Sequence, residues 1–600
     1  MVVEKKSVYA GVFLQDGSFS ITLVSKNKKV VLCEKVKKTN NTVEPLLSWF
    51  TQYSIHKNRK IIAVGIVGAG WESLYNRIWL ELDAVPVRVS VKGKNAEALS
   101  KKAAHLARDN FDKDDSHKVQ LDGYGRVGVQ SLVKLADYEK ITPPDEFRFL
   151  INEARKFKGK RLLFISATPQ GGGVAIMRHG MMRLLRLLGV RADWLVLKDD
   201  ERAFYITKIL FHNVLQGVAL KGVSLSRDDK AYYNHWCAQN AKRIGDVFPE
   251  YGVIVLDDPQ PSGLFSYIKK KNPKSKIIYR SHIELVSRLA DREGTSQKVT
   301  WDFIWDKLKD CDLFVSHPVQ RFIPKNVPRQ KVVFAPPCTD PLDGLNKELT
   351  EEQKGYYMQV FNRLLFKSGQ VPLDPDRAYI AQIARFDPSK GIPDLIHAYK
   401  KLIGKYKGSS LVKPQLVIVG NGSIDDPEGV PVLNMTKKML SVDEFKDIRD
   451  DVKLIRLLPH DQLLNTVCRQ AKVIVQLSKR EGFEFKIAEA LIKGKPVIIY
   501  NSGGMPVQIN HGKTGFVVNR SDIDGVTEYL FKLMTDARLY NKMSSQARRL
   551  PVDVLTPSHT ASWLWMANEI LSEDFKPNGG YIKTLSGQGK FGLKRFKVLD

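Results

Sequence analysis

The chain has 600 residues, of which 43% are hydrophobic and 26% are charged, and its formal net charge is +29. This length suits about three or four domains, and the composition is that of a globular protein rather than a disordered chain. The first residues lack a signal-peptide pattern, and no run of ~18 apolar residues occurs. We therefore expect a cytoplasmic protein without a membrane span.

Cysteine spacing and charge distribution exclude several further classes. No two of the five cysteines form a CxxC pair, which predicts free thiols and neither a disulfide framework nor a zinc site. No aspartate or histidine pattern has metal-ligand spacing, so we expect neither a metal nor a cofactor. The basic residues are scattered, which favours a solvated surface or an anionic substrate over nucleic acid as a partner.

The N-terminal quarter divides into two parts. Residues 1–91 alternate strand-like runs at 8–14, 61–67 and 85–91 with polar turns. This pattern predicts an accessory α/β domain. Residues 92–155 are rich in Lys and Asp, show weak periodicity and contain two consecutive prolines at 143 and 144. They predict a linker that is partly disordered.

From residue 156 strands alternate with helices. A first series, within 156–370, has strands at 161–166, 194–197, 253–256, 277–279, 313–315 and 332–334. A second series, within 371–545, has strands at 378–384, 415–419, 452–456, 473–477 and 496–500. Such alternation predicts two facing, doubly wound Rossmann-like domains. Ligands bind beyond the carboxyl ends of such strands, so the site is expected in the crevice between the domains.

The last segments are expected to leave the second domain. Residues 546–571 predict C-terminal helices that return to the first lobe. Residues 572–600 contain five glycines among six basic residues. Because glycine loosens the backbone and like charges repel one another, this composition predicts a flexible basic tail.

Two motifs suit a phosphate group. Gly172 and Gly173 belong to a three-glycine run that follows a strand and opens a helix. Glycine permits close backbone approach, and a helix N-terminus attracts phosphate; a tight turn alone is the alternative. Arg385 follows a strand, and Lys390 lies in the turn before the next helix. A guanidinium and an ammonium in one crevice suit a phosphate, although two solvated cations are the bland alternative.

A third motif runs from Glu481 through Gly482 and Phe483 to Glu489. Eight residues at a helical rise of ~1.5 Å place the two glutamates about 12 Å apart, which exceeds the ~5–9.5 Å of a glycosidase pair. We expect them to hold different parts of one extended donor, with the N–H groups of Gly482 and Phe483 facing the crevice. Two helix-surface glutamates are the alternative. His282 stands out among the histidines because it closely follows a strand.

These motifs resemble glycosyltransferase family 4, which has the GT-B fold. The spacing from Arg385 to Lys390, followed by Glu481 and Glu489, is the family's pattern. Longer strings at 166–175, 257–261, 279–283 and 384–393 are similar to those of fungal trehalose phosphorylases and trehalose synthases. The resemblance is specific from about residue 160 to 520 and weaker in residues 1–91.

The resemblance implies a retaining hexosyltransferase that interconverts trehalose plus phosphate with α-glucose 1-phosphate plus glucose. It implies that Arg385 and Lys390 hold the phosphate and that Glu481 holds glucosyl hydroxyls. Glu489 would support the donor site, and His282 would line the anomeric centre. The strings expected on the acceptor side contain Lys208, His212, Asn213, Asp258 and Gln260.

Two alternatives stay open at this point. A nucleotide-sugar donor, such as UDP-glucose or ADP-glucose, would use the same Arg, Lys and Glu residues in a trehalose synthase. A non-catalytic basic binding protein on the same scaffold would account for the charge, although intact motifs argue against it. The expected partners are small sugars and phosphate, and a homodimer is left open.

Overall fold

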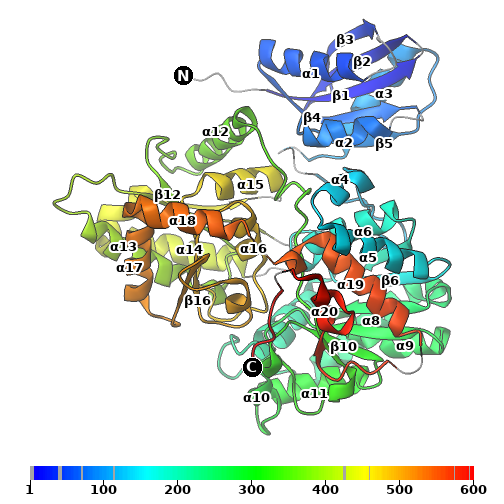
Figure 1. The fold of residues 1–600 in the computed structure, drawn as a ribbon, viewed down its shortest axis with the longest axis vertical. Helices are drawn as coiled ribbons and strands as arrows, with labels where there is room; N and C mark the ends of the chain where they lie inside the picture. Colours follow the sequence, from blue (N-terminus) through cyan, green and yellow to red (C-terminus); the bar gives the residue numbers. More distant parts are fainter. Residues whose placement is uncertain are drawn as a thin grey trace.

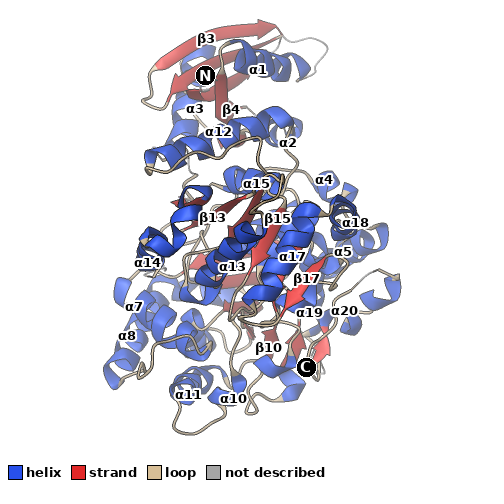
Figure 2. Cartoon of the chain, turned by 90° about the vertical axis from the view of Figure 1, so that its left-hand side faces the viewer, coloured by secondary structure: helices blue, strands red, loops and turns tan. Residues whose placement is uncertain are grey.

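The computed structural model describes residues 6–15, 17–37, 43–68, 72–112, 115, 117–422, 428–457, 460–549, 551–572, 575–593 and 595–600. Figure 1 shows an N-terminal domain at one end of the long axis and two lobes beyond it, and the rotated view in Figure 2 keeps this arrangement. The first lobe comprises residues 135–349 and 551–600, and the second lobe comprises residues 351–549. Within the described residues, no helix combines the length and apolar content needed to cross a membrane.

The N-terminal domain is a mixed five-stranded sheet in the order β3-β2-β1-β4-β5. Its strands are β1 (Lys6–Gln15), β2 (Ser18–Ser25), β3 (Val30–Lys37), β4 (Arg59–Val67) and β5 (Val85–Val89). Its helices are α1 (Glu44–His56), α2 (Glu72–Leu80) and α3 (Ala96–Asp109). The hairpins β1–β2 and β2–β3 are antiparallel, and β4 lies parallel to both β1 and β5.

Helices occupy half of the linker predicted over 92–155. Helix α3 packs closely on the N-terminal sheet, since a Cβ at Gly11 or Gly65 would overlap its backbone. Its buried face is made mainly of alanines, which give little hydrophobic contrast in the sequence and so explain the wrong prediction. Helices α4 (Leu135–Lys140) and α5 (Pro144–Lys156) belong to the first lobe, where the Tyr138 hydroxyl donates to Asp340 at 2.8 Å.

The first lobe contains an all-parallel seven-stranded sheet in the order β18-β11-β10-β9-β8-β6-β7. Its strands are β6 (Arg161–Ser166), β7 (Arg191–Val196), β8 (Val253–Asp257), β9 (Lys276–Arg280), β10 (Leu313–Ser316), β11 (Val332–Phe334) and β18 (Gly580–Tyr581). Its other helices are α6 (Gly173–Leu187), α7 (Glu201–Tyr205), a π-helix (Ile206–Asn213), α8 (Arg227–Ile244), α9 (Phe265–Lys271), α10 (Ser287–Ala290) and α11 (Ser296–Leu308).

The second lobe contains an all-parallel six-stranded sheet in the order β14-β13-β12-β15-β16-β17. Its strands are β12 (Tyr379–Ile383), β13 (Gln415–Asn421), β14 (Val452–Leu457), β15 (Val473–Gln476), β16 (Val497–Tyr500) and β17 (Gly515–Val518). Its helices are α12 (Glu351–Lys367), α13 (Ile392–Lys405), α14 (Gly429–Ser441), α15 (Asp461–Gln470), α16 (Phe485–Ile492), α17 (Ile523–Thr535) and α18 (Ala537–Ala547). The expected pair of doubly wound domains is therefore confirmed.

Two segment boundaries differ from the sequence expectation. Helix α12 was expected in the first lobe, but its buried Phe361 and Leu365 belong to the core of the second. Residues 572–600 were expected as a flexible tail, but residues 575–593 and 595–600 are packed against the first lobe, to which α19 (Thr556–Glu569) returns the chain. Strand β18 pairs with β11 there, and α20 (Ile582–Leu585) follows. Two basic side chains of this segment, Lys583 and Arg595, pair with distant carboxylates, which local sequence patterns do not reveal.

A buried charge cluster joins the N-terminal domain to the connector between the lobes. The carboxylate of Asp83 is fully buried and lies 2.9 Å from Lys60 Nζ and 2.7 Å from Lys347 Nζ. Tyr357, on α12, donates its hydroxyl to the same carboxylate. Burial alone would raise the pKa of Asp83, but the two ammonium groups hold that pKa below its usual value.

The Asp83→Ala variant should therefore lose about 3–5 kcal/mol of unfolding free energy, because it leaves two buried ammonium groups without their carboxylate. The matched control is Glu81→Ala, which removes a half-exposed carboxylate paired with Arg77 and should cost below about 1 kcal/mol. Denaturant unfolding at neutral pH measures both. Equal losses in the two variants would contradict the assigned role of Asp83.

Candidate active site

A cavity of about 250 Å³ lies between the two lobes, beyond the carboxyl ends of the strands β6, β8 and β9 on one side and β12 and β15 on the other. This is the place expected for a ligand of two facing doubly wound sheets. Most of the site residues predicted from the sequence line it, namely Gly172, Gly173, Lys208, His212, Asp258, Gln260, His282, Arg385, Lys390 and Glu481. Asn213, Gly482, Phe483 and Glu489 do not.

The N-terminus of α6 forms one wall. Gly171 has a φ of 91°, which favours glycine, and Gly172 is the N-cap of the 15-residue helix. Gly173 needs glycine for a different reason, since a Cβ there would overlap the ring of Phe485 in the second lobe. The free N–H groups of this helix end can therefore face an anion at the closest approach of the lobes.

Lys390 sits between two carboxylates on the opposite wall. Its Nζ donates to Glu484 at 2.8 Å and also to Glu481. Burial alone would lower the pKa of Lys390, but the two carboxylates raise it above its usual value. For Glu481 burial prevails over the attraction of Lys390, and its pKa is raised. Lys390 is thus a permanent cation, beside which Glu481 binds a proton more readily than an exposed glutamate.

Arg385 and Lys208 meet around Asp387. Lys208, on the π-helix of the first lobe, lies 3.0 Å from the Asp387 carboxylate of the second lobe. Burial opposes ionisation of Asp387, yet the charges of Lys208 and Arg385 hold its pKa well below the usual range. Asn213, on the same π-helix, donates to Glu428 of the second lobe at 3.0 Å. Two residues of this helix, Lys208 and Asn213, therefore contact the second lobe. Asn213 fastens the lobes together rather than lining the cavity.

His282 is held by a buried chain of charge. Its Nε2 lies 3.0 Å from Asp257, whose carboxylate also accepts hydrogen bonds of 2.7 and 2.9 Å from Arg178. Burial lowers the pKa of His282 to about 4, while Arg178 overcomes the effect of burial and lowers the pKa of Asp257. The ring is therefore neutral at pH 7 and donates Nε2–H to Asp257. Its Nδ1 makes no hydrogen bond within the described residues and is left as an acceptor.

Gly482 and Phe483 pack against the first lobe next to the cavity. A Cβ at Gly482 would overlap the carbonyl oxygen of His282. The Phe483 ring stacks on His317 with centroids 5.7 Å apart. These two residues therefore set where the loop of Glu481 lies.

Glu489 is buried on α16, where its carboxylate lies 2.6 Å from Lys486 Nζ. Helix α16 starts only at Phe485. The helical spacing predicted for the whole stretch from Glu481 to Glu489 is therefore wrong.

Sequence reasoning missed three carboxylates that tune the site. Glu484 lies within the third motif, three residues after Glu481, and its positive φ of 69° turns it toward Lys390. Asp387 lies between Arg385 and Lys390 in the sequence. Asp257 directly precedes Asp258 at the end of a strand. That position could have identified Asp257 as a site residue from the sequence.

Comparison with known proteins gives a match for each of the two lobes. Residues 164–324 match the family model described as the trehalose synthase N-terminal domain, and residues 366–550 match glycosyl transferases group 1. A trehalose phosphorylase of Pleurotus pulmonarius is 32% identical, with 96% of this chain and 88% of the relative aligned. A trehalose synthase of Pyrococcus horikoshii is also 32% identical, with 73% of this chain and 96% of the relative aligned.

The fold is also found among solved structures. A trehalose-6-phosphate synthase superposes with a TM-score of 0.53 at 15% sequence identity, covering 69% of this chain and 99% of that one. This likeness supports the GT-B-like arrangement of the lobes. Together with the matches along the sequence, it leads to one assignment: the chain belongs to the glycosyltransferase family of trehalose phosphorylases and trehalose synthases.

Proposed function

We propose that the protein is a retaining trehalose phosphorylase. It converts trehalose and phosphate to α-glucose 1-phosphate and glucose, and it runs the reverse reaction. The observation that carries this proposal is the pairing, in one cavity, of an anion site with a sugar site. The α6 N-terminus and Arg385 supply the positive side, and Glu481 and Glu484 supply acceptors for hydroxyl groups.

The residues on the positive side suit a phosphate. A helix N-terminus binds phosphate through main-chain N–H groups, and a guanidinium binds two phosphate oxygens at once. Lys390 adds a second permanent cation, which the two glutamates hold in place. On the acceptor side, Lys208, His212, Asp258 and Gln260 line the part of the cavity formed by the first lobe.

Two observations favour phosphate over a nucleotide sugar as the donor-side partner. The Glu489 carboxylate pairs with Lys486 and lies outside the cavity lining, so it is not presented to the hydroxyl groups of a ribose. In addition, the phosphorylase relative aligns with 96% of the chain, including the N-terminal domain, whereas the synthase relative aligns with 73%.

Retention follows from attack on the same face. A phosphate oxygen bonds to the anomeric carbon on the side from which the glycosidic oxygen departs, and the proton of the phosphate moves to that oxygen as glucose leaves. Arg385 and the α6 N-terminus stabilise the charge that develops on the phosphate. The neutral His282 lines the cavity without adding a charge beside the sugar. Closure of the lobes excludes water and with it hydrolysis.

The direct test is phosphate-dependent breakdown of trehalose. Purified protein with trehalose and inorganic phosphate should yield α-glucose 1-phosphate, because the anion site and the sugar site share one cavity. A parallel reaction with UDP-glucose and glucose tests the second donor. Product in the second reaction alone would overturn the proposal in favour of a nucleotide-dependent trehalose synthase.

Arg385→Ala should lower kcat about 100- to 1,000-fold, the usual effect of removing one group that stabilises transition-state charge. The matched control is Arg377→Ala, at the opposite end of β12, where the guanidinium pairs with Asp451 at 2.7 Å. The control should keep near-normal kcat, and both variants should unfold at similar temperatures. Near-normal turnover in Arg385→Ala would refute its role.

A further inference from the structure

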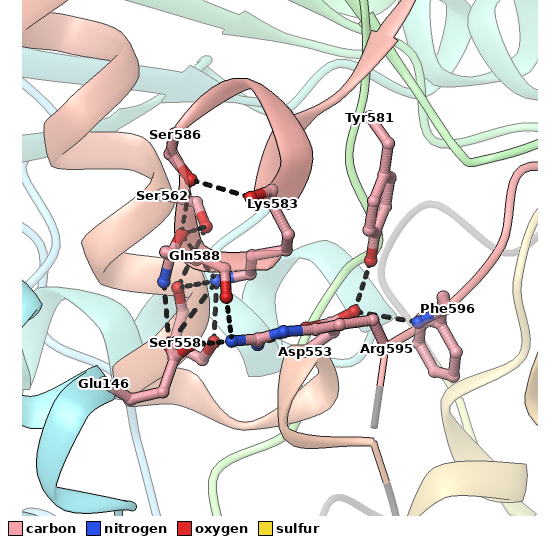
Figure 3. Close-up of polar contacts among 10 residues, drawn as sticks. All are labelled: Glu146, Asp553, Ser558, Ser562, Tyr581, Lys583, Ser586, Gln588, Arg595 and Phe596. Atoms are coloured by element: carbon pink, nitrogen blue, oxygen red, sulfur yellow. Dashed lines mark hydrogen bonds and ion pairs between the residues drawn. The ribbon is translucent and has the colours of Figure 1, made fainter. Parts of the chain in front are cut away.

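A buried ionic cluster fixes the course of the last residues on the first lobe, as Figure 3 shows. The Arg595 guanidinium lies 2.7 Å from Asp553 and also pairs with Glu146 on α5. Lys583 lies 3.9 Å from Glu146 and donates to the Ser558 hydroxyl at 2.6 Å. Two fully buried carboxylates thus face two cations, and removing one partner of such a set is strongly unfavourable. Arg595 is therefore held in one place.

The next residue reaches the second lobe. The Phe596 N–H donates to Asp553 at 3.0 Å, and its side chain is 5% exposed. Its ring centroid lies 5.8 Å from that of Phe483, with the planes at 63°, a favourable edge-to-face geometry. Phe483 lies two residues after Glu481, so the C-terminal segment touches the loop that carries a proposed sugar-binding residue.

Phe483 connects this contact to the other side of the cavity. It also stacks on His317, whose Nε2 lies 3.0 Å from the His282 carbonyl oxygen. Burial, together with the nearby charge of Arg280, lowers the pKa of His317 well below its usual value. The ring is neutral, and because Arg280 donates to Nδ1 at 3.2 Å, Nε2 carries the proton and donates to His282. An ordered row of rings thus runs from Phe596 to the main chain of His282.

The end of the segment holds the chain that follows His317. The Leu599 N–H donates to Pro318 at 2.8 Å, and its carbonyl oxygen accepts from the Gln320 N–H at 2.7 Å. These bonds add a short stretch of parallel pairing directly after His317. The segment therefore supports both the residue that Phe483 stacks on and Phe483 itself.

A second connection reaches Glu481 through Arg321. This guanidinium donates to the main-chain oxygen of Asp600 at 3.2 Å and to that of Gly503, in the second lobe, at 3.0 Å. The N–H of the adjacent Gly504 donates to the Glu481 carbonyl oxygen at 3.1 Å. Two independent routes, one of rings and one of hydrogen bonds, therefore lead from residues 595–600 to the loop of Glu481.

We propose that residues 595–600 position the loop 481–485 for catalysis, with Phe596 as the positioning residue. Phe596 does not touch the substrate. It sets the place of Phe483, and through it the place of Glu481, relative to His282 when the lobes are closed. The proposal rests on the proposed sugar-binding role of Glu481. It gives a function to a segment that composition alone describes as a loose basic tail.

The test compares Phe596→Ala with Phe591→Ala. Phe591 lies four residues before Arg595, and its ring packs on Phe149 of α5 with centroids 6.3 Å apart rather than on the loop. Phe596→Ala should lower kcat for phosphorolysis about 10- to 100-fold, since misplacing a positioned group by about 1 Å can have this effect. Phe591→Ala should retain near-normal kcat. Phe596→Leu, which keeps apolar volume, should recover part of the loss and serves if the alanine variant does not fold.

A double-variant cycle separates positioning from a general structural role. Glu481→Gln should cost distinctly less in the Phe596→Ala protein than in the wild type, because the misplaced Glu481 contributes less. The same cycle with Phe591→Ala should be additive. Additive effects in both cycles, or equal losses of kcat in the two single variants, would overturn the proposal.

Hydrogen exchange gives a readout that does not depend on the reaction. Amides of residues 481–485 should exchange faster in Phe596→Ala than in Phe591→Ala. If the wild type is active only with UDP-glucose, the proposed phosphorylase function is wrong. The double-variant cycle is then measured in the reaction of UDP-glucose with glucose. If the wild type is inactive with both donors, the exchange data decide. Unchanged protection of 481–485 would refute the positioning role in either case.

Discussion

One carboxylate in the first lobe holds the loop of the second lobe that carries Glu481. Glu284, two residues beyond His282, accepts the N–H of Glu481 at 2.7 Å and the guanidinium of Arg480 at 2.9 Å. Because the acceptor and the donors come from different lobes, the cavity has its walls only when the lobes are close. The proposed anion site on α6 and Arg385, and the proposed sugar site that faces it, depend on this closed arrangement.

The close approach of the two lobes explains why glycine occupies positions where no turn requires it. A side chain at Gly173 would strike the Phe485 ring, and one at Gly482 would strike the His282 carbonyl oxygen. A side chain at Gly503 would come within 2.8 Å of the Glu284 carboxylate of the first lobe. Glycine at these three positions therefore lets the two lobes approach closely. The motif that carries Glu481 thus serves the docking of the lobes, beside the sugar-binding role proposed for it.

The sequence predicted what local patterns determine. Apolar runs located the strands of both lobes except the edge strands β17 and β18. The residues just after the located strands, including His282 and Arg385, lie in one cavity because the carboxyl ends of parallel strands converge there. Partners from distant elements were missed. Glu484 faces Lys390 only through a positive φ, and Arg595 meets Glu146 across 449 positions of sequence. No local pattern encodes such pairs. The alanine face of α3 was missed because its apolar contrast is low.

The buried charges near the end of the chain are better explained by specificity than by stability. Desolvation offsets most of the attraction in a buried ion pair, so Arg595 with Glu146 and Asp553 adds little net stability compared with an apolar contact. Such a pair does penalise other placements of the chain, since each would leave a charge buried alone. Because these pairs hold Arg595 in one place, the next residue, Phe596, is placed against Phe483. The buried charges thus fix Phe596, and through Phe483 they fix the position of Glu481. For the role proposed for Glu481, a displacement of about 1 Å would matter to the rate.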